Sequence, residues 1–64
     1  MRTLQIEKTP SGQFRYRIVT PFEDLSKTFL VNVDWEFGPF SKEETIEQAK
    51  DRFLGNGPFN LESR

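Results

Sequence analysis

The sequence predicts a single small α+β domain, residues 1–64, in which a three-stranded antiparallel sheet carries one C-terminal α-helix on one face. Three observations predict this class. Two stretches separated by a turn, 2–8 and 13–20, alternate apolar and polar residues, and the stretch 29–37 does so most regularly. A period of two is typical of strands with one buried face. Residues 42–54 instead place their apolar side chains on one helical face.

The first two strands are expected to form a hairpin around the turn at 9–12. This turn contains Pro10, which fixes φ, and Gly12, which accepts a left-handed conformation. A connection this short between two alternating runs favours antiparallel pairing. In the first strand Leu4 and Ile6 share the inward face. In the second strand Phe14, Tyr16 and Ile18 are predicted to face inward, and Arg15, Arg17 and Val19 outward.

The third strand is predicted over 29–37, because every odd position in this stretch is a large apolar residue. Its inward set is Phe29, Val31, Val33, Trp35 and Phe37, and its outward set is Leu30, Asn32, Asp34 and Glu36. Two outward carboxylates on this strand are expected to pair with two arginines of the neighbouring strand. The pairs would join Asp34 and Glu36 to Arg15 and Arg17.

The helix is predicted to begin after Ser41, which stands three residues before Glu44 in the spacing of a capping box. Its apolar face consists of Ile46, Ala49, Phe53 and Leu54, and Gly55 is placed to end it. The tail alternates again at Phe59 to Glu62. That pattern permits either a short final edge strand or a tail packed on the core.

The composition argues against an enzyme. The chain has no cysteine and no histidine, so it lacks thiolate metal ligands and the usual general base near neutral pH. No catalytic, cofactor-binding or metal-binding residue is predicted, and no cofactor is expected. No apolar run approaches the length of a membrane span or a secretory signal, which favours the cytoplasm.

Charge segregation favours a function in binding. Residues 1–20 carry four basic residues and one acidic residue, a sum of +3, whereas residues 21–47 carry two basic and seven acidic residues, a sum of −5. We therefore expect a small protein-interaction module, an accessory or inhibitory protein that attracts a basic partner protein and anchors on an aromatic side chain. The predicted partner-binding residues are Asp34, Glu36, Phe40, Glu43, Glu47 and Asp51. A homodimer is a further alternative, because association of two copies would add stability to so small a hydrophobic core.

The alternative is a weak nucleic-acid-binding domain that uses the basic hairpin, through Arg2, Lys8, Arg15 and Arg17. Three antiparallel strands followed by a helix, with the junction Gly38-Pro39-Phe40-Ser41-Lys42-Glu43-Glu44, resemble the small DNA-binding domains at the amino end of tyrosine recombinases. The resemblance covers residues 13–53 and implies DNA binding. The acidic third strand departs from the basic sheet expected in those domains.

Overall fold

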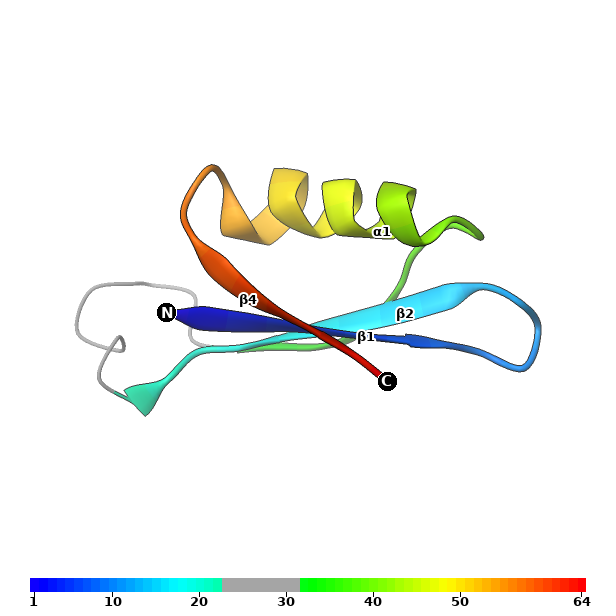
Figure 1. Cartoon of the computed structure of the whole chain (residues 1–64), viewed down its shortest axis with the longest axis horizontal. Helices are drawn as coiled ribbons and strands as arrows, with labels where there is room; N and C mark the ends of the chain where they lie inside the picture. Colours follow the sequence, from blue (N-terminus) through cyan, green and yellow to red (C-terminus); the bar gives the residue numbers. More distant parts are fainter. Residues whose placement is uncertain (23–31) are drawn as a thin grey trace.

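A computed structural model of the chain describes residues 1–22 and 32–64. Its elements follow the order β1–β2–β3–α1–η2–β4, and Figure 1 shows the helix lying across one face of the sheet. Residues 29–31 of the predicted third strand lie outside the described residues. The bounds are β1 Arg2–Lys8, β2 Phe14–Val19, β3 Val33–Phe37, α1 Lys42–Ala49, η2 Lys50–Leu54 and β4 Phe59–Ser63.

Within residues 1–22 and 32–64, the sheet has four strands in the order β3-β2-β1-β4. The antiparallel β1–β2 hairpin pairs Leu4 with Ile18, and β3 pairs antiparallel with β2. The three antiparallel strands and the helix agree with the predicted α+β class. The final strand is present and makes the sheet mixed, because β4 pairs parallel with β1 and sets Leu61 beside Leu4.

The core lies between the sheet and the helix. Its buried apolar residues are Leu4, Ile6, Tyr16, Ile18, Val33, Ala49 and Leu54, and four partly buried residues pack against them: Phe14, Ile46, Phe53 and Phe59. The rings of Tyr16 and Phe53 are tilted by 54° with centroids 6.3 Å apart, a favoured arrangement of two aromatic rings. The other face of the sheet has no helix over it in the described part of the chain (Figure 1).

The helix begins where predicted, but the capping box is only half formed. The Ser41 hydroxyl accepts from the Glu44 amide at 3.4 Å and donates to a carboxylate oxygen of Glu43 at 3.0 Å. The helix start also packs closely on the end of β3. A Cβ built on Gly38 would lie 2.5 Å from Thr45 Cγ2, and Thr45 is fully buried. Only glycine fits this contact between strand and helix.

The last turn of the helix is π-helical, over Lys50–Leu54. The Gly55 amide donates to the Lys50 carbonyl at 2.7 Å, and Gly55 ends the helix with φ +65°. The predicted end at Gly55 is confirmed. The wider turn lets two consecutive residues, Phe53 and Leu54, both reach the core.

The predicted inward face of the third strand is wrong beyond Val33, because a β-bulge interrupts the pairing. Ile18 pairs with Val33 but Tyr16 pairs with Glu36, so two positions on β2 span three on β3. One extra residue reverses which side chains face the core. Trp35 and Phe37 therefore lie on the open face of the sheet, and Phe37 is 64% exposed. Glu36 turns to the helix side instead and remains exposed.

The predicted ion pairs between β2 and β3 are also not formed. Arg15 makes an ion pair with Glu7, and Arg17 donates to the side-chain oxygen of Gln5. Both partners belong to β1, which places Glu7 opposite Arg15 and Gln5 opposite Arg17. The arginines thus pair with side chains of β1 and not of β3, because the β1–β2 register is regular and places these partners directly opposite.

Candidate functional site

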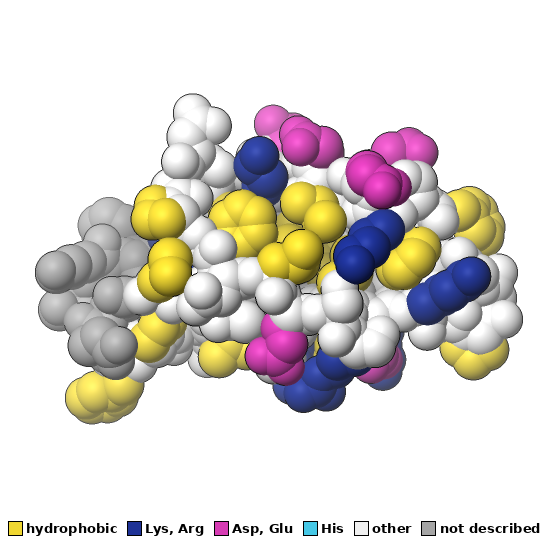
Figure 2. Space-filling model, in the orientation of Figure 1, with side chains coloured by type: hydrophobic (Ala, Val, Ile, Leu, Met, Phe, Trp, Pro, Cys, Tyr) yellow, Lys and Arg dark blue, Asp and Glu magenta, His cyan; other side chains and the backbone are white. Residues whose placement is uncertain are grey.

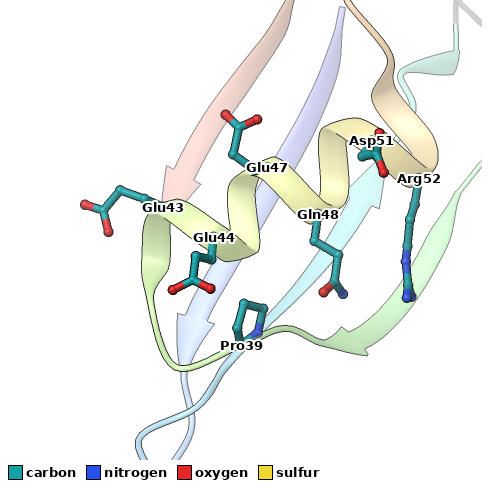
Figure 3. A pocket seen from close by; sticks show the side chains of 7 residues that line it. All are labelled: Pro39, Glu43, Glu44, Glu47, Gln48, Asp51 and Arg52. Carbon is teal, nitrogen blue, oxygen red and sulfur yellow. The ribbon is translucent and has the colours of Figure 1, made fainter.

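The outer side of the helix forms a shallow acidic depression. It is lined by Pro39, Glu43, Glu44, Glu47, Gln48, Asp51 and Arg52, four carboxylates against one guanidinium, a sum of −3. Figure 3 shows that Glu44, Gln48 and Arg52 project from the helix on the side of Pro39 and β3, whereas Glu43 and Glu47 project away from it. All four carboxylate residues are exposed.

In this depression, the carboxyl group of Glu43 is stabilised in its charged form. The pKa of Glu43 is lowered, chiefly by a hydrogen bond to its own backbone amide and also by the hydrogen bond from Ser41. Lys50 lies 3.7 Å from a carboxylate oxygen of Glu47 and offsets part of the charge. An anionic surface with little internal neutralisation can attract a cationic partner at a distance.

Two exposed phenylalanines stand at the junction of β3 and α1. Phe37 is the last residue of β3 and is 64% exposed, and Phe40 is 70% exposed one residue before the Ser41 cap. A Cβ built on Gly12 would lie 4.0 Å from a ring carbon of Phe40, so this ring lies beside the β1–β2 turn. Exposed apolar side chains next to a charged surface are typical of protein-binding sites.

The open face of the sheet carries a second cluster, formed by Arg15, Arg17 and Trp35. The guanidinium carbons of the two arginines lie 4.4 and 4.8 Å from the centroid of the Trp35 ring, which is the geometry of cation–π contacts. Phe37 is the cross-strand neighbour of Arg15 on this face. The cluster therefore combines two cations, an indole and an exposed phenyl ring.

The structure brings only part of each predicted set together. In the partner-binding set, Phe40 lies directly before the helix that carries Glu43, Glu47 and Asp51. The bulge places Glu36 on the helix side of the sheet, the same side as these carboxylates. Asp34 does not belong to that surface. Its carboxylate accepts a hydrogen bond from the backbone amide of Trp35 at 2.8 Å.

The predicted nucleic-acid-binding set divides in a similar way. Arg15 and Arg17 are neighbours on the open face. Lys8 is exposed at the end of β1, and Arg2 donates to the Phe53 carbonyl at the end of the helix. The four cations do not form one continuous patch.

Trp35 and Phe37 are candidate binding residues that the sequence did not indicate. The sequence predicts both in the core, because every odd position over 29–37 is a large apolar residue. A bulge leaves no mark in such a pattern, as it depends on how the neighbouring strand is paired. Figure 2 shows acidic side chains gathered over the helix, and basic and acidic side chains together on the lower, open face of the sheet.

Within residues 1–22 and 32–64, no three acidic side chains converge closely enough to hold a metal ion. None of the helices described is both long and apolar enough to cross a membrane. No protein-family model, no curated protein and no solved structure matches this chain.

Proposed function

We propose that this protein is a small interaction module that binds a partner protein through the junction of β3 and α1, as an accessory or inhibitory protein of the cytoplasm. The observation that carries the proposal is the pair of exposed rings at this junction: Phe40 directly before the acidic helix, and Phe37 at the end of β3 on the open face of the sheet. A domain of 64 residues has few apolar side chains to spare, so two phenylalanines left in solvent favour a role outside the core.

The two parts of this surface have different roles in the proposal. Aromatic side chains bury a large area with little loss of side-chain freedom, so they commonly supply most of the binding energy. Phe40 is the better anchor, because it is the more exposed of the two rings. The acidic side chains of Glu43, Glu47 and Asp51 speed the encounter with a basic surface and contribute to specificity.

The test is affinity capture of the tagged full chain, quantified by mass spectrometry, with Phe40→Ser compared with the parent protein. Phe40 lies outside the core cluster, so this variant is expected to fold normally. A partner that depends on this anchor should be depleted about tenfold or more, as expected for a hot spot that contributes about 2 kcal/mol. Equal recovery of every captured protein with both chains would refute the proposal.

The acidic side chains are tested separately through the rate of association with the captured partner. Glu43→Gln with Glu47→Gln removes two negative charges, and Val19→Lys with Asn60→Lys adds two positive charges at exposed positions away from the helix and from Phe40. The helix variant should slow association at low salt, and the control should do so much less. Equal slowing by both variants would show that only net charge matters.

A second candidate function, nucleic-acid binding, is favoured by the cluster of Arg15, Arg17 and Trp35 on the open face. Arg17 bonds to the neutral side chain of Gln5, and among the described residues no carboxylate forms an ion pair with it. Cations beside aromatic rings, here the half-buried Trp35 and the exposed Phe37, are suited to single strands, whose bases stack on rings while phosphates contact the guanidinium groups. The carboxylate of the neighbouring Glu7 forms an ion pair with Arg15.

Trp35 is the only tryptophan, so its fluorescence can be used to measure nucleic-acid binding directly. Base stacking should quench its fluorescence when an oligothymidine is titrated, with an affinity that falls steeply as salt rises. Arg17→Glu should abolish the change, whereas Arg52→Glu on the helix should not. Unchanged fluorescence at millimolar nucleotide would exclude stacking on this face.

A further inference from the structure

The two edges of the sheet differ in whether another strand can pair with them. The β3 edge is obstructed in three ways: by its bulge, by the Asp34 carboxylate on the Trp35 amide, and by the Gln48 side chain, which donates to the Phe37 carbonyl at 3.2 Å. Bulges and side chains that occupy backbone groups are means by which proteins prevent strands from adding at an edge.

The β4 edge lacks these obstacles. Phe59–Ser63 contains no proline, lysine or bulge. The side chain of Glu62 accepts a hydrogen bond from Gln5 of β1 and forms an ion pair with its neighbour Arg64. No described strand lies beyond β4 in the sheet. Leu61, at the middle of β4, is 48% exposed although it shares the helix side of the sheet with the buried Leu4.

The register with β1 fixes which backbone groups of β4 point outward. The Arg64 amide donates to the Ile6 carbonyl at 2.8 Å, so the even-numbered residues of β4 bond to β1. In a strand, neighbouring residues direct their amide and carbonyl groups to opposite sides. The amide and carbonyl groups of Phe59, Leu61 and Ser63 therefore point to the free edge.

We propose that this edge pairs with the β4 of a second copy of the chain, in an antiparallel register centred on Leu61. In this register Leu61 meets its own symmetry mate as a hydrogen-bonded pair, and Phe59 meets Ser63 of the other copy. All three outward-facing residues then exchange backbone hydrogen bonds across the two-fold axis. The two four-stranded sheets become one continuous sheet of eight strands.

The side chains of β4 complement themselves in this register, which is why a second copy is the occupant. On the helix side the half-exposed Leu61 is covered by Leu61 of the other copy. On the open face Glu62 stands opposite Asn60, so identical charges do not face each other directly, and Arg64 lies 3.7 Å from Glu62. A register shifted by one pair toward Glu62 would set the two Glu62 side chains face to face.

Cysteine cross-linking tests both the pairing and its register, because the chain has no cysteine of its own. The Cα atoms of a hydrogen-bonded pair lie about 5.5 Å apart, within the range that a disulfide spans. Leu61→Cys should therefore form a covalent dimer under mild oxidation. Asn60→Cys and Glu62→Cys should each form far less dimer alone, since diagonal positions lie about 7–8 Å apart. Mixed together, these two variants should cross-link as a heterodimer.

Sedimentation velocity of the full chain provides the independent measurement. The parent protein should approach twice the monomer mass as its concentration rises from micromolar toward millimolar, and Leu61→Lys should remain monomeric with an unchanged circular dichroism spectrum. The helix variant Glu43→Gln with Glu47→Gln should dimerise like the parent, which separates this surface from the proposed partner site. A monomer at every concentration, or a Leu61→Cys protein that oxidises no faster than Asn60→Cys, would overturn the proposal.

Discussion

Replacing Gly38 by alanine should destabilise the domain more than almost any other addition of one methyl group. The added Cβ would lie 2.5 Å from Thr45 Cγ2, 2.6 Å from Oγ1 and 2.9 Å from Cβ. Favourable contacts between carbon atoms are about 3.5–4.0 Å, so roughly 1 Å of separation is missing. Thr45 cannot swing aside, because it is fully buried and its hydroxyl lies 2.9 Å from the Ser41 carbonyl.

The helix start must therefore move away from β3, and we expect a loss of about 3 kcal/mol, the upper end of the usual cost of overpacking. A domain of 64 residues is expected to have about 3–10 kcal/mol of total stability at 0.05–0.15 kcal/mol per residue. Urea denaturation followed by circular dichroism should thus show a much lower midpoint with a similar slope. At the low end of that range the variant would be largely unfolded without urea.

Gly57→Ala is the matched control, since a Cβ there would meet nothing closer than the Leu54 carbonyl oxygen at 3.8 Å. Its unfolding free energy should change by less than about 0.5 kcal/mol. Thr45→Ser removes the methyl group nearest to the clash while keeping the hydroxyl. In that background Gly38→Ala should cost less than it does alone, a coupling between contacting residues. An unchanged midpoint for Gly38→Ala itself would refute the close packing of β3 against the helix.

Three further predictions concern single elements. Val33→Asp should unfold the domain by burying a charge, whereas Phe37→Asp should be tolerated, and equal damage by chemical denaturation would contradict the bulge. Ser41→Ala should cost about 0.5–2 kcal/mol as a lost helix cap. The same change should raise the pKa of Glu43, which NMR titration of the parent should place below 4.5. A carboxyl group whose pKa is lower in the folded than in the unfolded protein stabilises the fold at pH values above its unfolded pKa. The stabilisation by Glu43 should therefore be lost as the pH falls below 4.5. Gly55→Ala should cost about 1 kcal/mol, measured by urea denaturation, because Gly55 has φ +65°.

The sequence predicts those parts of the fold that depend on neighbours in the chain. The β1–β2 hairpin follows from two alternating runs and a turn rich in proline and glycine, and the helix follows from Ser41, its apolar face and Gly55. Each of these signals acts over a few residues. Local patterns of this kind are sufficient for elements whose partners are adjacent in sequence.

What the sequence does not predict depends on pairing between distant segments. The bulge opposite Arg17 is set by how β3 meets β2, and it decides whether Trp35 faces the core or the solvent. The parallel pairing of β4 with β1 joins the two ends of the domain, and no feature of residues 59–63 indicates that direction. The candidate binding residues in the structure differ from the predicted ones for the same reason. Its helix and Phe40 were indicated by local composition, whereas Trp35 and Phe37 became available only through the bulge.

The place of β1 in the sheet has a consequence for biosynthesis. Of the four described strands, β1 is the first to leave the ribosome, yet one of its two neighbours, β4, is the last to be made. Gln5 and Glu62, which join these strands, are 57 residues apart. Contacts between such distant residues slow folding, because a long loop must close before they form. Until β4 emerges, the nascent chain exposes the apolar β1 edge, so a ribosome paused before residue 59 would hold an intermediate prone to aggregation.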